Sequence, residues 1–349
     1  MKKNVVVVGY GGMGSWHAEH IRKSDVVSLS GIFDVKERRI LRARENGIRA
    51  YSSFEEVLND KSVDIISVCS TNENHKESTI RALLAGKNVI CEKPVTMTVE
   101  DFDEMVQTSK RTGKLFSVHQ NRRWDEDFIA IKSLAESGEI GELINIESRV
   151  HGSRGIPGDW RGKKEFGGGM ILDWGVHLID QILCIFKDDR LRSVYCVATH
   201  ITNEEVDDGF KLSLAFQSGK TAFVEVGTYN FISLPRFYMQ CRGGSAIING
   251  WTSKPHIAKA ESRGEDVIEP VKTAAGITKT MAPRDEFSIR EYDMERPVSD
   301  VHDYYRNFCA AIDGKAELAV KLCEVRRCLQ VIEAAFESAA GNKVINTDI

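Results

Sequence analysis

The feature that most constrains the fold is a glycine-rich loop that directly follows a short apolar run. Val5–Val8 predict a buried strand, residues 9–14 read Gly-Tyr-Gly-Gly-Met-Gly, and residues 15–23 can continue as a helix. The spacing matches G-x-G-x-x-G, in which the first glycine permits a tight turn, the second admits a pyrophosphate, and the third lets the helix pack closely. This loop predicts a dinucleotide-binding unit, with a plain glycine-rich turn as the alternative. The expected cofactor contacts here are Gly9, Gly11, Gly12, Met13 and Gly14.

An acidic residue at the end of the next apolar run supports this interpretation. Residues 26–33 predict a second strand, and Asp34 follows it, twenty residues after Gly14. A carboxylate there can accept hydrogen bonds from the adenosine ribose of NAD, whereas it would repel the 2'-phosphate of NADP. We therefore predict NAD in preference to NADP. Three nearby cations could neutralise a phosphate, although the charges around them are typical of a solvated helix start; they are Lys36, Arg38 and Arg39.

Strand and helix patterns then alternate as far as residue 121. Apolar runs at 63–69, 88–91 and 115–119 predict strands, and residues 75–85 and 99–112 predict helices. Such alternation is typical of an α/β Rossmann domain with a doubly wound, mainly parallel sheet. Nucleotides bind outside the carboxyl ends of these strands, so residues that follow the strands are expected beside the cofactor. These residues are Ser70, Thr71, Asn72, Glu92 and Lys93.

The pattern changes from residue 122 onward, where strands follow one another with short turns. Such a series predicts an α+β domain with a large, mainly antiparallel open sheet. Residues 250–297 show no clear period. We expect residues 1–121 to form the NAD(P)-binding domain and 122–349 to form a substrate-binding and oligomerisation domain. The predicted strands are 143–151, 193–202, 210–216, 221–229, 236–241 and 245–249, and the predicted helices are 127–136, 169–187, 298–313 and 319–340.

Composition excludes several classes of partner. The net charge of -4 provides no basic field for nucleic acid, and the apolar runs are shorter than the roughly 20 residues that span a bilayer. The N-terminal apolar run is four residues long and lacks a cleavage site, so a cytoplasmic location is expected. Eight cysteines without a C-x-x-C pair predict free thiols, and no metal site is expected. An open sheet with few covering helices predicts a homodimer or homotetramer.

Three residues form a candidate acid–base set. Lys93 lies at a stiff corner before Pro94, and the peptide bond between them is predicted to be cis. Asp173 and His177 are four apart on a predicted helix. Oxidation of an alcohol by a nicotinamide requires a base for the hydroxyl proton, a role for which histidine is suited. An ammonium can stabilise the developing alkoxide, and the carboxylate can orient the imidazole or anchor the substrate. The simpler alternatives are a solvated lysine and an ordinary helix-surface pair.

These residues together resemble a known family. The glycine loop, Asp34, Glu92-Lys93-Pro94 and the run 167–180 occur in the order found in Gfo/Idh/MocA oxidoreductases, of the glucose-fructose oxidoreductase and inositol dehydrogenase type. The resemblance covers essentially the full length. It implies catalysis by Lys93, Asp173 and His177. Residues 119–125 and 159–161 are similar to a branch acting on cyclitols and pyranosides. The resemblance further implies cofactor contacts from His75 and Gln120 and substrate contacts from Asn121, Arg122, Trp160 and Arg161.

The function predicted from these features is that of an NAD-dependent dehydrogenase. The expected substrate is a secondary ring hydroxyl of a sugar, a glycoside or an inositol-like cyclitol, and the reaction could also run as a reduction. Two alternatives stay open: a redox-neutral, NAD-dependent enzyme that cleaves glycosides, and a non-catalytic sensor of dinucleotides or sugars. The presence of Lys93, Asp173 and His177 together argues against a sensor, which needs none of them.

Overall fold

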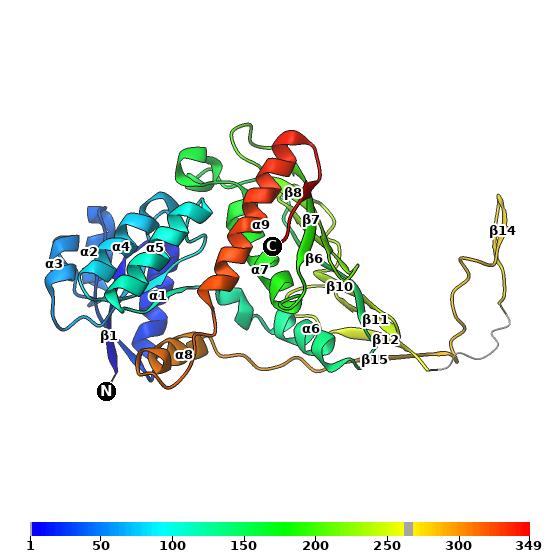
Figure 1. Ribbon diagram of the computed structural model, residues 1–349, viewed down its shortest axis with the longest axis horizontal. Coiled ribbons are helices and arrows are strands. Elements are labelled where there is room, and N and C mark those ends of the chain that lie inside the picture. Colours follow the sequence, from blue (N-terminus) through cyan, green and yellow to red (C-terminus); the bar gives the residue numbers. More distant parts are fainter. Residues whose placement is uncertain (1, 262–267) are drawn as a thin grey trace.

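A computed structural model describes residues 2–261 and 268–349, and it places two sheets side by side along the long axis of the molecule (Figure 1). The first sheet has five parallel strands in the order β2-β1-β3-β4-β5. The residues Val5–Val8 are all buried, as expected for a strand covered on both faces. This arrangement confirms the predicted Rossmann fold. The strands are β1 (Lys3–Val8), β2 (Val27–Phe33), β3 (Ile65–Val68), β4 (Asn88–Cys91) and β5 (Phe116–Val118).

Helices connect these strands and have recognisable start and stop signals. The Thr98 side chain accepts a hydrogen bond from the Asp101 backbone N–H at the start of α5, and Gly113 ends that helix in the left-handed conformation. The connecting helices are α1 (Gly12–Lys23), α2 (Glu37–Glu45), α3 (Phe54–Asn59), α4 (His75–Leu84) and α5 (Val99–Thr112). Two short 3-10 turns lie beside the carboxyl edge of the sheet, η1 (Asn72–Asn74) and η2 (Asn121–Trp124).

The second sheet has nine strands in the order β15-β12-β11-β10-β6-β9-β8-β7-β16. Every neighbouring pair is antiparallel except β6 and β9, which run parallel. The sheet is therefore large and mainly antiparallel, as predicted. Six of its strands correspond to the predicted runs: β6 (Leu143–His151), β7 (Leu191–Thr199), β8 (Gly209–Phe216), β9 (Thr221–Gly227), β10 (Phe237–Cys241) and β11 (Gly244–Ile248).

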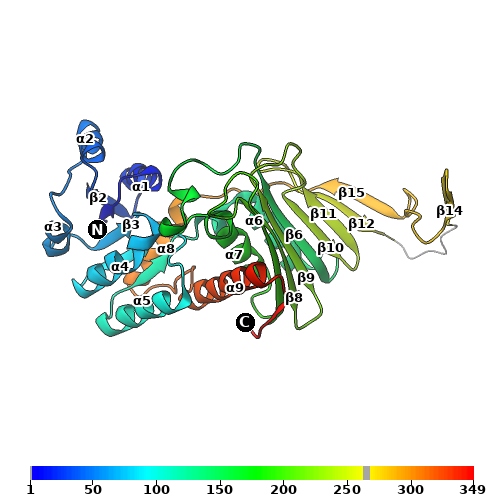
Figure 2. The same ribbon diagram turned by 90° about the horizontal axis from the view of Figure 1, so that it is seen from above.

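The stretch 250–297, for which the sequence showed no period, supplies two further strands and an arm. β12 (His256–Ala260) and β15 (Ile289–Asp293) pair with each other at one edge of the sheet. Between them, β13 (Val271–Thr273) and β14 (Gly276–Thr278) form a hairpin that projects away from the body (Figures 1 and 2). Residues 262–267 of this stretch lie outside the described residues. The ninth strand, β16 (Ile345–Asn346), pairs with β7.

Helices of the second half of the chain serve both sheets. α6 (Glu126–Ser137), α7 (Val176–Ile185) and most of α9 (Leu322–Gly341) pack in one core with the nine-stranded sheet. By contrast, α8 (His302–Ile312) contributes Tyr304, Tyr305 and Phe308 to the core of the Rossmann sheet, together with Val325 and Leu329 of α9. The chain thus returns to the first core after β15 and adds the last strand of the second sheet, β16, only after α9. The predicted boundary between the two domains, after residue 121, remains a prediction.

The segment before α7 is less regular than the predicted helix 169–187. It contains two 3-10 turns and a π-helical turn that continues directly into α7: η3 (Trp160–Gly162), η4 (Lys164–Phe166) and η5 (Ile171–Gly175). By length and composition, Lys164–Ile185 could cross a membrane, since it has 22 residues and a mean hydropathy of 1.2. However, 83% of its apolar window is buried inside the protein, which is the behaviour of a core helix.

Candidate active site

The glycine loop forms a cradle with space for an anion. Gly9 has φ +93°, and a Cβ on Gly14 would lie 1.8 Å from the Gly9 carbonyl oxygen, so both positions require glycine. No side chain caps the first turn of α1, and a Cβ on Gly12 would meet nothing within 4 Å. Free backbone N–H groups at a helix N-terminus bind phosphate. The loop, including Met13 in that first turn, therefore fits a dinucleotide pyrophosphate.

Asp34 lies beside this cradle and holds the loop in place. Its Oδ2 accepts a hydrogen bond from the Tyr10 backbone N–H at 2.6 Å, and its Oδ1 accepts one from the Lys36 backbone N–H at 2.8 Å. Arg39 also contacts Oδ2, at 3.0 Å, and its guanidinium lies 3.3 Å from where a Gly11 Cβ would stand. The Lys36 and Arg38 side chains are exposed. Of the three predicted cations, Arg39 is thus the one fixed at the cofactor edge.

The residues after β3 connect the two halves of the molecule. Asn72 is buried and donates a hydrogen bond to the Gly167 carbonyl at 3.0 Å, while Ser70 and Thr71 lie half-buried beside the glycine loop. The His75 ring nitrogens face two backbone carbonyls, those of Pro94 at 2.9 Å and Ser70 at 3.1 Å. Burial lowers the pKa of His75, so the ring is neutral and donates only one of these bonds. His75 braces the loops after β3 and β4 against each other.

Lys93 and Asp173 meet across the interface between the two sheets. The Lys93–Pro94 peptide bond is cis, as predicted. Lys93 Nζ lies 2.9 Å from both the Asp173 Oδ1 and the Asp173 carbonyl oxygen. The other carboxylate oxygen, Oδ2, accepts a hydrogen bond from Arg161 Nε at 3.0 Å. Burial acts to raise the pKa of Asp173, but the charges of Lys93 and Arg161 outweigh burial and lower it. Asp173 is therefore an ionised partner of two cations.

His177 is a buried, neutral base next to this ion pair. Its Nδ1 has no hydrogen-bond partner among the described residues. Burial, followed by the charges of Lys93 and Arg122, lowers the pKa of His177 well below its usual value. Within residues 2–261 and 268–349, no hydrogen bond joins Asp173 to His177, because the carboxylate is occupied by Lys93 and Arg161. The geometry thus favours Asp173 as an anchor of Lys93 over its alternative role as an orienter of the imidazole.

Aromatic and amide groups surround these ionisable residues. The Arg122 guanidinium lies over the rings of Trp174, at 4.3 Å, and Trp251, at 5.0 Å, and Trp174 in turn makes an edge contact with His177. Two buried amide oxygens, Gln120 Oε1 and Asn121 Oδ1, have no partner in the described part of the chain. Unpaired buried acceptors of this kind are available to a hydroxylated ligand. The remaining predicted substrate residue, Trp160, packs on Arg161 at 4.7 Å.

Sequence reasoning missed Trp174 and Trp251 as site residues. Trp174 directly follows Asp173 in the sequence, and this position could have indicated that it lies at the site. Trp251 lies in the stretch without a period, where no sequence signal placed it near the site.

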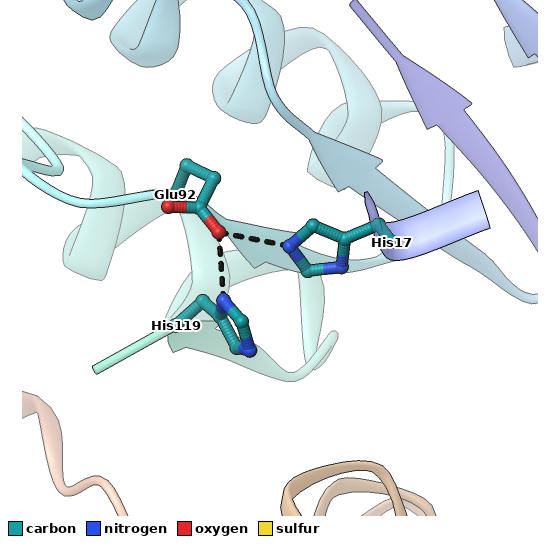
Figure 3. Close-up of side chains that lie close together, drawn as sticks. All are labelled: His17, Glu92 and His119. Atoms are coloured by element: carbon teal, nitrogen blue, oxygen red, sulfur yellow. Dashed lines mark hydrogen bonds and ion pairs between the residues drawn. The ribbon is translucent and has the colours of Figure 1, made fainter. Parts of the chain in front are cut away.

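Sequence reasoning also missed a buried cluster beside Lys93, formed by His17, Glu92 and His119. Glu92 Oε1 lies 2.8 Å from His17 Nε2 and 2.7 Å from His119 Nδ1 (Figure 3). Imidazole and carboxylate are ligands for divalent metals, and the three ligand atoms lie within 4.8 Å of one another. In the metal-free arrangement, direct hydrogen bonds from both rings already satisfy Glu92 Oε1. Glu92, expected as a cofactor contact, is here a buried partner of two histidines.

Known proteins share both halves of this architecture. Residues 3–120 match the oxidoreductase family with an NAD-binding Rossmann fold, and residues 128–247 match the GFO/IDH/MocA C-terminal domain. The 1,5-anhydro-D-fructose reductase of Ensifer adhaerens is 34% identical over 267 residues, which cover 73% of this chain and 79% of the relative. The scyllo-inositol 2-dehydrogenase (NADP(+)) of Bacillus subtilis strain 168 is 28% identical over 346 residues, 98% of this chain and 95% of the relative.

A solved structure, that of an NAD-binding protein from Listeria innocua, superposes with a TM-score of 0.96 at 44% identity and covers 99% of both chains. The family matches and this solved structure agree with the two-part fold described above. The chain belongs to the Gfo/Idh/MocA family of NAD(P)-dependent oxidoreductases.

Proposed function

We propose that this protein is an NAD-dependent dehydrogenase that oxidises a secondary ring hydroxyl of a sugar, a glycoside or a cyclitol, or catalyses the reverse reduction. The observation that carries this proposal is the juxtaposition of the Lys93–Asp173 ion pair with the neutral, buried His177. These groups lie beyond the carboxyl end of β4, on the side of the Rossmann sheet where nucleotides bind.

The chain's own residues supply binding and proton transfer. His177, kept neutral by burial and two cations, accepts the substrate hydroxyl proton, and the Lys93 ammonium stabilises the alkoxide oxygen as it forms. Asp173 and Arg161 hold Lys93 in a fixed position, so the ammonium needs little reorganisation during the reaction. A nicotinamide held by the glycine loop would supply the hydride acceptor for the carbon that bears this hydroxyl.

NAD is the proposed cofactor, and Asp34 is the reason. Its carboxylate lies next to the glycine loop, where it can accept hydrogen bonds from a ribose and would repel a 2'-phosphate. Arg39 contacts the same carboxylate, and its guanidinium can bind a phosphate only when the ion pair with Asp34 is broken. The choice needs a direct test because one relative is named as an NADP(+)-linked enzyme.

The proposed substrate class rests on the polar lining of the site and on the relatives. Asn121 and Gln120 offer buried amide oxygens, and Arg122 and Arg161 offer guanidinium groups, a mixture that suits several hydroxyls on one ring. Relatives named as acting on inositols and on an anhydro sugar support the same class.

The direct test is to incubate the purified protein with NAD, or separately with NADP, and a panel of cyclitols, glycosides and anhydro sugars. The proposal expects nicotinamide reduction with at least one member of the panel, with a matching amount of keto product. Product without net nicotinamide change would instead favour the redox-neutral, glycoside-cleaving enzyme. Binding of nucleotide and sugar without any product would favour the sensor.

We also propose that the protein assembles as a homodimer or homotetramer through the open face of the nine-stranded sheet and works in the cytoplasm. Helices α6, α7 and α9 form a core with one face of this sheet (Figure 2). The projecting arm carries exposed apolar side chains, with Ile277 71% and Phe287 89% exposed, which a second copy could cover. All eight cysteine thiols are free, as predicted, in keeping with a reducing compartment.

A further inference from the structure

We propose that His17, Glu92 and His119 form a positioning device for the acid–base site: the two histidines hold the Glu92 carboxylate, and the carboxylate in turn fixes Lys93. This inference rests on the proposed function, because it assigns a role toward the Lys93–His177 pair. The three side chains converge from separate elements. His17 comes from α1, Glu92 follows β4, and His119 follows β5 (Figure 3).

The cluster is a buried charge with defined donors. His17 and His119 are 0% exposed and Glu92 is 4% exposed. Glu92 Oε1 accepts one N–H from each ring, which requires His17 to carry its proton on Nε2 and His119 on Nδ1. The Tyr305 hydroxyl of α8 lies 2.6 Å from His17 Nδ1, so the ring nitrogen that faces away from Glu92 also has a hydrogen-bond partner. A buried carboxylate is costly unless it is hydrogen-bonded, so each of these donors stabilises the arrangement.

The second carboxylate oxygen connects the cluster to catalysis. Glu92 Oε2 accepts a hydrogen bond from the Lys93 backbone N–H at 3.2 Å. The next contact is Lys93 Nζ on Asp173, at 2.9 Å. Helix α1, strand β4, strand β5 and helix α8 are thereby joined through one carboxylate to the residue that carries the catalytic ammonium. Rotation of Glu92 would release the backbone at Lys93 and loosen that ammonium.

Glu92 also sets part of the charge around His177. The groups that act on His177 are Lys93, Arg122 and His119, which lower its pKa together with burial, and Glu92, which raises it. Around Glu92 itself, the facing groups are His17 and His119, with Tyr304, Tyr305, Cys69 and Cys91 nearby. His119 and His17 together outweigh burial and hold the pKa of Glu92 well below its usual value. The carboxylate is therefore a fixed negative charge that opposes the two cations at His177.

Four substitutions test the cluster. Glu92→Gln keeps an oxygen that can accept both imidazole N–H groups, but it removes the charge and puts an NH2 group in place of the Oε2 that accepts the Lys93 N–H. His17→Gln and His119→Asn keep a side-chain N–H near the position of the lost Nε2–H or Nδ1–H, whereas His17→Ala removes it. The matched control is Glu19→Gln, which makes the same change on α1 at an exposed residue that pairs with Lys23.

We expect Glu92→Gln to lower kcat by roughly 10- to 100-fold, because a misplacement of about 1 Å at a catalytic group has effects of that size. The acid limb of the kcat profile should move to lower pH, because loss of the negative charge lowers the pKa of His177 further. The Kd for NAD should stay within about threefold of wild type. His17→Gln should retain more turnover than His17→Ala, and Glu19→Gln should match the wild type.

A second measurement, of the protonation of the two histidine rings, does not depend on enzyme turnover. In the full chain labelled with ¹⁵N-histidine, nitrogen chemical shifts should report His17 as the Nε2–H tautomer and His119 as the Nδ1–H tautomer. The opposite tautomer of either ring would overturn the inference. Because this measurement uses the wild-type protein, it needs neither a folded variant nor a known substrate. Stoichiometric metal in the purified protein that is lost in Glu92→Gln would overturn it in favour of a metal site.

The inference and the proposed function fail in different ways. Wild-type turnover that Glu92→Gln leaves unchanged, with an unmoved acid limb, refutes the positioning role while the dehydrogenase stands. Absence of nicotinamide turnover in the wild type refutes the proposed function, and the histidine tautomers then decide about the cluster alone.

Discussion

Replacement of Asp34 by alanine should change the cofactor preference of this enzyme. In the wild type the carboxylate is buried beside the glycine loop and accepts hydrogen bonds from the Tyr10 and Lys36 backbone N–H groups. A ribose 2'-hydroxyl can donate to it, whereas a 2'-phosphate would meet a like charge. The substitution removes the repulsion. It also removes the carboxylate oxygen that lies 3.0 Å from the Arg39 guanidinium in the wild type, so Arg39 becomes free to bind a phosphate.

The size of the effect follows from the charges. Two unit charges about 4 Å apart near a protein surface interact by about 4 kcal/mol. Arg39 already offsets part of the Asp34 charge, and its side chain is 31% exposed, so solvent screens the remainder. We therefore expect a change of about 1–3 kcal/mol in the preference, a factor of roughly 5–150 in the ratio of the two binding constants.

The assay is titration of NAD and NADP into wild type, Asp34→Ala and Asp34→Asn. Asparagine keeps an acceptor for the Tyr10 N–H but loses the charge and the acceptor for the Lys36 N–H, so its ratio should lie close to that of Asp34→Ala if the charge decides the preference. Glu37→Ala removes an exposed carboxylate from the start of the neighbouring helix α2 and should leave the ratio unchanged. Tighter binding of NADP by the wild type, or an unchanged ratio in Asp34→Ala, would refute the role given to this residue.

Three further outcomes follow from the same geometry. Because burial and two cations lower the pKa of His177, it stays neutral as pH falls through 6.5; kcat should hold until well below that value, and a pH–rate profile with an acid limb above 6.5 would contradict this. Gly14→Ala would place a methyl group 1.8 Å from the Gly9 carbonyl oxygen, so NAD binding should fall by about tenfold or more in calorimetry, while Gly158→Ala, where a Cβ meets nothing within 4 Å, should bind as wild type. Light scattering at micromolar concentration should give the mass of a dimer or tetramer, and a monomer would contradict assembly through the open sheet face.

Strong local patterns made much of the fold predictable from the sequence. Strand β6 was predicted at residues 143–151 and is observed with the same bounds, since it combines β-branched and other apolar residues with a turn on its N-terminal side. Helix α5 was predicted at 99–112 with the same bounds as observed, since Thr98 and Gly113 mark its ends. The glycine loop was equally visible, because the spacing of its glycines between a strand and a helix is a local pattern.

The features that escaped prediction depend on contacts between distant residues. Strands β12 and β15 are five residues long and carry charged side chains, and pairing with neighbouring strands is what defines them. Helix α8 was expected from its period, but no period could show that Tyr304 and Tyr305 pack against the Rossmann sheet. His17 and Glu92 are 75 positions apart and are polar, so in the sequence each resembles a surface residue.

The candidate site divides in the same way. Its order along the chain, from the glycine loop through Lys93 to Asp173 and His177, was available from motifs. The pairing of Asp173 with Lys93 and Arg161 was not, because the irregular segment 160–175 has no helical period that fixes where its side chains point.

We propose that Lys93 and His177 act in one proton-transfer step. The decisive measurement is the turnover of Lys93→Ala, His177→Ala and the double variant. With saturating NAD and an active substrate, each single variant should lose roughly 100-fold or more in kcat, and the double variant should lose little beyond the worse single one. The Kd for NAD should be nearly unchanged, and exposed-site controls, Lys61→Ala and His200→Ala, should match the wild type. Near wild-type kcat in either single variant, or losses that multiply in the double variant, would contradict the account.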